Sequence, residues 1–267
     1  MKNAVRKLSL AALCALGMGS ASALVVTNET NATALANAIA GTGVTISNAT
    51  LTTNTPSPSA TFTGGAGSVG FESGIVLTTG TTDCVAGPNN QGGCSAGGTS
   101  TSLRFDFTST TGELFFQYVF GSEEYTQYVN SSFNDEFQLL LNGVNIAVLP
   151  GGAGVVSINN VNCTANSSFY RNNRDGESNQ TPGCVNQNLD VQYDGLTTVL
   201  TASALLNAGV NTFEFLIFDR GDSSLDSGVF IKAGSFTGVN ETPEPGALAL
   251  IGLGLAAAAA ARRRKSA

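Results

Sequence analysis

Short runs with the alternation of β-strands recur along this chain, and turn residues separate them. The run LRFDF at Leu103–Phe107 alternates apolar and charged residues, as a half-buried strand does. The run LFFQYVF at Leu114–Phe120 is apolar on both faces, which predicts a central strand. Within Glu136–Leu149, Asn142-Gly143 separates two apolar runs, and this dipeptide is the strongest short signal for a hairpin. No long helical period competes, so we expect an all-β domain, an antiparallel and jelly-roll-like β-sandwich.

Other segments complete the predicted domain. Further strands are expected at Gly43–Thr53, Gly74–Gly80, Val155–Val161, Leu189–Tyr193, Leu196–Ala202, Asn211–Asp219 and Gly228–Phe236. One short helix is expected at Thr33–Ala40, with Asn31 or Thr33 as its N-cap. The chain shows no repeat of fixed period and no second core. Asn159–Asn188 is a long irregular insertion, and such loops are usually functional or held by a covalent bond.

The first 23 residues have the pattern of a secretory signal peptide. Lys2, Arg6 and Lys7 form its positive start, an apolar stretch follows, and Ala21-Ser22-Ala23 is a small-residue cleavage site. The alternative is a short N-terminal membrane helix, but the apolar stretch is too short for one and its flank fits cleavage better. We therefore expect an exported chain that begins after Ala23.

The cysteines agree with export. Cys14 leaves with the signal peptide, and an even set remains: Cys84, Cys94, Cys163 and Cys184. Proximity in the sequence favours the disulfides Cys84–Cys94 and Cys163–Cys184 among the possible pairings. A zinc site made of four thiolates is the competing idea, but the chain has no C-x-x-C spacing and no histidine.

The C-terminal segment, residues 242–267, has three parts in a fixed order. Pro243-Glu244-Pro245 comes first, Gly246–Ala261 is apolar throughout, and an Arg/Lys cluster, RRRK, follows. As a helix the apolar part would rise about 24 Å, somewhat short of the hydrocarbon layer, which local thinning could accommodate. The cations should stay in the cytoplasm, so the body of the protein would lie outside.

These three parts together resemble the PEP-CTERM sorting signal of Gram-negative bacteria. The resemblance implies recognition and cutting by an exosortase, after transient anchoring in the inner membrane by the transmembrane helix. It further implies delivery to the cell envelope, the surface or the extracellular matrix, often beside exopolysaccharide. A plain C-terminal membrane anchor is the alternative.

The charge of the body is strongly negative. Residues 24–242 carry 18 acids against five bases. A nucleic-acid partner is therefore not expected, because phosphate binding needs Lys and Arg on one face. A hard cation as partner fits this charge better, although a merely soluble acidic surface would have the same composition.

Three acidic clusters flank apolar strands. They contain Glu123 and Glu124 in GSEEY, Asp135 in FNDEF, and Asp219, Asp222 and Asp226 in FDRGDSSLDSG. Carboxylates at strand ends repel one another unless a positive charge lies between them, and Ca²⁺ takes several oxygen ligands. We therefore expect a calcium site assembled from these loops. Alternatively, the residues form turns and cap backbone groups, as Asp commonly does.

The sequence contains few residues that could act in catalysis. Without histidine there is no Ser-His-Asp or Cys-His arrangement. Glu124 and Asp135 could act as the two carboxylates of a carbohydrate hydrolase, which is the alternative function. Glu123 and Glu124 cannot form that pair, since neighbours on a strand point to opposite faces. The chain also has no tryptophan to stack on sugar rings.

A second resemblance covers residues 24–241. It rests on ordered blocks, which read GFESGIVLTTG, VFGSEEY, FNDEFQLLLNG, NIAVLP, VSINNVN, QYDGLTTVLTAS and IFDRGDSSLDSGVFIKAGSF. They resemble the choice-of-anchor L domain, which implies an extracellular β domain without established enzymatic activity. Taken together, we expect a structural, adhesive or ligand-binding surface protein, not an enzyme, stabilised by calcium and associated with exopolysaccharide or other envelope components.

Overall fold

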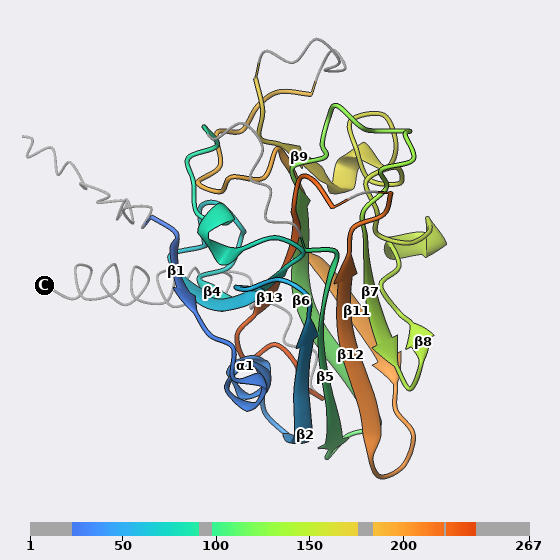
Figure 1. The fold of residues 1–267 in the computed structure, drawn as a ribbon. Coiled ribbons are helices and arrows are strands. Elements are labelled where there is room, and N and C mark those ends of the chain that lie inside the picture. The colour runs from blue at the N-terminus through green and yellow to red at the C-terminus, as the bar shows by residue number, and fades with distance from the viewer. Residues whose placement is uncertain (1–22, 91–97, 176–183, 222, 239–267) are drawn as a thin grey trace, which may run out of the picture.

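Two antiparallel β-sheets pack against each other in the computed structural model of this chain (Figure 1). The structure describes residues 23–90, 98–175, 184–221 and 223–238. The expected all-β class and the antiparallel sandwich are confirmed. Within these ranges, no helix has the length and apolar character needed to cross a membrane. The predicted transmembrane segment Gly246–Ala261 and nearly all of the signal peptide lie outside them.

The larger sheet has eight strands, in the order β1-β3-β4-β13-β6-β10-β9, with β11 also paired to β6. Their bounds are β1 Val25–Asn28, β3 Ser59–Thr63, β4 Ser73–Thr78, β6 Glu113–Ser122, β9 Tyr170–Asn172, β10 Gly195–Thr197, β11 Leu200–Leu205 and β13 Ser227–Lys232. As its two apolar faces predict, β6 is central: it pairs with β13 on one side and with β10 and β11 on the other.

The smaller sheet has five strands, in the order β2-β5-β12-β7-β8. Their bounds are β2 Val44–Thr53, β5 Ser100–Ser109, β7 Glu136–Leu141, β8 Val144–Asn145 and β12 Asn211–Phe218. The turn between β7 and β8 has positive φ at both Asn142 (49°) and Gly143 (85°). This geometry matches the right-handed twist of the flanking strands, so the predicted hairpin forms.

Helices are few and short in the described residues. The helix α1, Ala32–Ile39, begins where the Asn31 side chain accepts a 3.1 Å hydrogen bond from the backbone N–H of Ala34. Its buried face, Leu35 and Ile39, packs on the core. Three single turns of 3₁₀-helix complete the set: η1 Thr82–Cys84, η2 Pro150–Gly152 and η3 Ser167–Phe169.

Apolar side chains fill two separate layers, although the sequence indicated no second core. The main core lies between the sheets and is rich in phenylalanine, with Phe105 and Phe213 stacked at 6.0 Å between ring centroids. A second cluster includes Val119 and Phe230, from strands β6 and β13 of the larger sheet. It also includes residues of loops, Tyr193 among them. Within β6, Val119 belongs to this second cluster while Phe116 and Phe120 belong to the main core, so both faces of the strand carry apolar side chains.

Asparagine side chains explain where predicted strands are missing. The strand β8 ends at Asn145, whose Oδ1 accepts hydrogen bonds from the backbone N–H groups of Leu139 (3.1 Å) and Ala147 (2.9 Å). Leu189–Tyr193 is not a strand, because the Asn173 amide donates to the carbonyls of Val191 and Tyr193 in place of a neighbouring strand. In both places an amide side chain forms the hydrogen bonds that backbone groups would otherwise form with a neighbouring strand, so the sheet is not extended.

Val155–Val161 is likewise not a strand, contrary to prediction. Val155 and Ser157 make only isolated bridges, and the segment then turns. The Asn162 amide donates to the carbonyl oxygens of Ile158 (3.0 Å) and Asn159 (3.2 Å). These bonds close a compact loop at the start of the long insertion.

Candidate cation site

Three predicted acids lie at the end of β6 and just before β7 and β13, which is the upper end of the sandwich in Figure 1. Glu123 directly follows β6, Asp135 directly precedes β7, and Asp226 directly precedes β13. These strands are antiparallel neighbours or face one another across the core, so an end of one lies beside the start of the next. Tertiary structure therefore collects carboxylates that lie about a hundred residues apart in the sequence.

These carboxylates are buried, which is unusual for acidic side chains. The exposed fraction is 1% for Glu123 and Glu124, 0% for Asp135 and 2% for Asp226. Asp194, with 1% exposed, is a further buried acid that the sequence prediction missed. It stands just before β10 in the run LDVQYDG, and its place after an apolar run could have singled it out.

Two arginines neutralise some of this charge. Arg174, from the long insertion, forms an ion pair with Asp194, and the Asn89 amide donates to the same carboxylate at 2.8 Å. Arg220 forms a second ion pair, with 3.2 Å between its Nη2 and Oε2 of Glu136. The ion pairs of these two arginines are made with Asp194 and Glu136.

Asp135 joins three segments of the chain. Its Oδ2 accepts a 2.6 Å hydrogen bond from the Ser227 hydroxyl, and its Oδ1 accepts a 3.0 Å bond from the backbone N–H of Arg220. Charge-assisted bonds of this kind are stronger than neutral ones. Asp135 therefore holds the starts of β7 and β13 together with the residues after β12.

Glu123 and Asp226 each have a buried oxygen without a hydrogen-bond partner. Asp226 Oδ2 accepts a 2.7 Å bond from the Thr78 hydroxyl and a 3.5 Å bond from Tyr193, but its Oδ1 has no partner in the described structure. Oε1 of Glu123 is likewise buried and has no hydrogen-bond partner in the described structure. The two residues are neighbours, since the Glu123 backbone N–H donates to the Asp226 carbonyl at 3.0 Å.

Burial changes the acidity of both groups. The pKa of Glu123 is raised to about 9, mainly by burial and also by the nearby charges of Asp194 and Asp226, while Arg174 opposes the rise. Burial also raises the pKa of Asp226 to about 7, although hydrogen bonds from Thr78 and Tyr193 lower it. In the metal-free protein Glu123 therefore holds a proton at neutral pH.

A crevice too narrow to admit a water molecule lies beside Asp226. Asp219, Ser223 and the backbone around Gly80 line it together with Asp226. A Cβ atom at Gly80 would lie 2.5 Å from the Cβ of Asp226, so only glycine allows the two segments to come this close. Asp219, Ser223 and Asp226 are among the polar residues that line the crevice at this close approach.

The sequence matches the choice-of-anchor L domain over residues 24–237, which is most of the chain. The chain belongs to the choice-of-anchor L family. A second match, to the PEP-CTERM protein-sorting motif, covers residues 241–265. That motif indicates an exported protein of the cell envelope or surface that an exosortase processes. No curated protein and no solved structure matches the chain.

The donor set of this choice-of-anchor L domain fits calcium in kind. The partnerless oxygens of Glu123 and Asp226 are hard ligands, and Thr79, Asp219 and Ser223 are among the residues that line the adjacent crevice. In the described ranges, however, no three or more Asp, Glu, Cys or His side chains converge on one point. Calcium would therefore need backbone carbonyls, hydroxyls and water besides carboxylates, as it commonly does. Asp222, another predicted ligand, lies outside the described residues.

The predicted hydrolase pair lies in the interior of the choice-of-anchor L domain. Glu124 and Asp135 are buried, and neither lines any of the three cavities whose walls are described in full. Both families matched are non-catalytic in kind. No observation in the described structure therefore favours the hydrolase.

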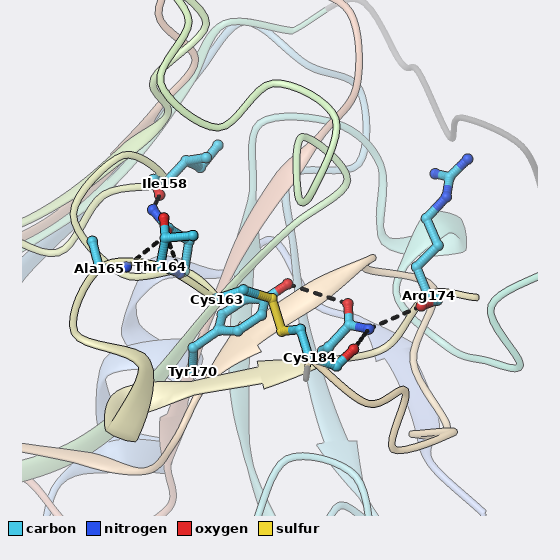
Figure 2. Close-up of a disulfide and its surroundings, with 9 residues drawn as sticks. Ile158, Cys163, Thr164, Ala165, Tyr170, Arg174 and Cys184 are labelled. Atoms are coloured by element: carbon cyan, nitrogen blue, oxygen red, sulfur yellow. Dashed lines mark hydrogen bonds between the residues drawn. A yellow bond between two sulfur atoms is a disulfide. The ribbon is translucent and has the colours of Figure 1, made fainter. Parts of the chain in front are cut away.

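The predicted Cys163–Cys184 disulfide is present in the choice-of-anchor L domain (Figure 2). It closes the long insertion, with 21 residues of sequence separation between its cysteines. Cys84 is also disulfide-bonded, while its predicted partner Cys94 lies outside the described residues. Cys163 and Cys184, bonded to each other, are not available as thiolate ligands for zinc.

Proposed function

We propose that this protein is a non-catalytic structural or adhesive component of the bacterial surface or extracellular matrix, and that Ca²⁺ binds at the acidic end of its sandwich. The observation that carries the calcium proposal is that two residues joined by a backbone hydrogen bond, Glu123 and Asp226, each have a buried carboxylate oxygen without a partner. Association with exopolysaccharide is part of the proposal and rests on the sorting motif.

The physical reason is the free energy of buried charge. Moving an ionised carboxylate out of water costs several kcal/mol unless a partner compensates for it. Protonation is one solution, and it is the one that the raised pKa of Glu123 describes for the metal-free chain. A divalent cation is the other solution, because it neutralises two carboxylates at once and accepts the partnerless oxygens as ligands.

In this proposal Glu123 and Asp226 are the central ligands. The other carboxylates of the predicted set are Glu124, Asp135, Asp219 and Asp222. Asp219 lines the crevice beside Asp226, and Asp135 orients the strand ends around it. The chemical role of the ion is structural: it would cross-link the ends of β6 and β13 and so stiffen one end of the domain outside the cell.

Thermal melting of the purified protein tests the calcium site. We expect Ca²⁺ to raise the melting temperature relative to EDTA, because a ligand at 100 times its Kd adds about 2.7 kcal/mol. At about 2–4 °C per kcal/mol for a domain of this size, the shift should be roughly 5–11 °C. Terbium offers a second readout, since Tyr193 lies beside Asp226 and can sensitise its luminescence.

Matched variants separate binding from general stability. Glu123→Gln and Asp226→Asn should abolish the calcium shift while the proteins stay folded in EDTA, because each keeps the shape and loses the charge. Glu113→Gln is the control, since Glu113 is exposed at the start of β6. An identical melt in EDTA and in saturating Ca²⁺ would refute the cation site. Release of reducing ends from polysaccharide would refute the non-catalytic role.

A further inference from the structure

Two cavities adjoin the Cys163–Cys184 disulfide and share Cys163 in their walls. The first, of about 240 Å³, lies between the β6–β7 loop and the start of the insertion, and Thr126, Gln127 and Asn162 line it. The second, of about 390 Å³, is lined by Tyr170 and Gln187 among others. Their sizes lie near the lower end of small-ligand sites, roughly 300–1,000 Å³.

The walls of both cavities carry no charge. Every polar lining side chain is an amide or a hydroxyl, and no Asp, Glu, Lys or Arg is among the lining residues. This is notable in a body with 18 acids against five bases. An ionic ligand would leave its charge unpaired there, so the walls select for a neutral one.

The first cavity contains polar groups that the protein leaves unsatisfied. Thr126 is 7% exposed, and its buried hydroxyl has no hydrogen-bond partner in the described structure. The neighbouring Gln127 is half-buried, and its amide makes no side-chain hydrogen bond within the described residues. A buried hydroxyl is normally paired, and an apolar ligand would leave that of Thr126 without a partner. A ligand with its own donors and acceptors would satisfy both side chains.

The walls are held in place without a ligand. Oδ1 of Asn162 accepts 2.9 Å bonds from the backbone N–H groups of Thr164 and Ala165, which fixes the loop beside the disulfide (Figure 2). Asn159 joins this loop to the β6–β7 loop, because its amide donates to the Ser131 carbonyl at 3.0 Å. Binding would therefore order few additional residues, which favours affinity.

We propose that these two cavities form a binding site for a neutral carbohydrate. Sugar hydroxyls donate and accept, as the Thr126 hydroxyl and the Gln127 amide require, while Val129, Tyr170 and the disulfide offer apolar surface to the ring C–H groups. This inference rests on the proposed surface function and deepens it: it names the ligand class and places it in the long insertion, away from the acids.

Binding to neutral glycans tests this site. The purified protein is applied, with Ca²⁺ present, to an array of uncharged oligomers of glucose, galactose, mannose and N-acetylglucosamine, and the binders are titrated by calorimetry. We expect saturable binding that Thr126→Val and Gln127→Leu each weaken by about three- to tenfold, the value of one hydrogen bond. Thr126→Val should also leave the melting temperature unchanged or raise it, because it removes a buried hydroxyl that has no internal partner.

Thr108→Val is the matched control, since Thr108 is exposed on β5. Unchanged affinity in this variant together with weaker binding in the other two supports the site. Binding to none of the neutral glycans, binding only to charged glycans or to neutral peptides, or equal affinity in all variants would overturn it. If calcium raises the melting temperature as expected but no glycan binds, only this inference is rejected. If a glycan binds but calcium does not change the melting temperature, only the cation site is rejected.

Discussion

Phe236 should be among the residues on which the stability of this domain depends most. Its ring is fully buried between the sheets, with centroids 5.0 Å from Phe107 and Phe213 and 5.3 Å from Phe105. Its backbone is bound as well, because its N–H donates to the Ile39 carbonyl at 3.0 Å and its carbonyl accepts from Gly41 at 2.9 Å. The last described residues thus complete the core just before the sorting motif begins at residue 241.

The expected loss follows from burial and ring packing. Phe→Ala in a core costs about 3–5 kcal/mol, and edge-to-face aromatic pairs contribute roughly 0.5–1.5 kcal/mol each beyond burial. With several such neighbours, Phe236→Ala should lose about 4–5 kcal/mol, a large part of the 5–15 kcal/mol typical of a domain. Phe236→Leu should lose less, about 1–2 kcal/mol, because most of the apolar burial remains.

Urea denaturation followed by circular dichroism measures these losses. Val210→Ala is the control, since Val210 is 65% exposed and should change stability by no more than about 0.5 kcal/mol. A chain that ends at Gly238 should keep wild-type stability, whereas one that ends at Ser235 should unfold readily. A loss below about 1 kcal/mol for Phe236→Ala would refute the assignment of this ring to the core.

Two further predictions concern the insertion. Arg174→Met should destabilise the protein by about 3–5 kcal/mol, because it leaves the charge of buried Asp194 without its ion-pair partner; thermal melts measure this, and the double variant with Asp194→Asn should recover much of the loss. Replacing Cys163 and Cys184 together by serine should lower stability by about 3 kcal/mol in denaturant, the value for a loop of this length, and should leave the calcium shift intact. A double cysteine variant as stable as the wild type would contradict the predicted stabilisation by the disulfide. Loss of its response to calcium would contradict the independence of the two sites.

Local signals predicted much of the fold. The alternation in LRFDF and LFFQYVF located β5 and β6, and Asn142-Gly143 located a hairpin whose turn needs positive φ at both positions. These features depend on the backbone preferences of a few adjacent residues, so they can be recognised without the fold. The missing strands at Val155–Val161 and Leu189–Tyr193 could not be predicted in this way. Their backbone groups are bound by the side chains of Asn162 and Asn173, and the second of these is distant in the sequence.

The candidate site was only partly predictable for the same reason. Acids after apolar runs indicated strand ends, which is where Glu123, Asp135 and Asp226 lie. Their separate roles did not follow from the sequence. Asp135 is engaged by Ser227 and by the backbone of Arg220, while Asp194 was not singled out although Arg174 pairs with it.

The sequence by itself determined the class of the domain, the hairpin at Asn142-Gly143 and the terminal sorting motif, because each depends on residues that are adjacent in the chain. Tertiary structure alone decided which carboxylates are buried, which have partners and which do not. Thr78 and Asp226, whose side chains bond at 2.7 Å, lie 148 residues apart in the chain. Burial and pairing are properties of such distant contacts, and they set the free energy of each charge.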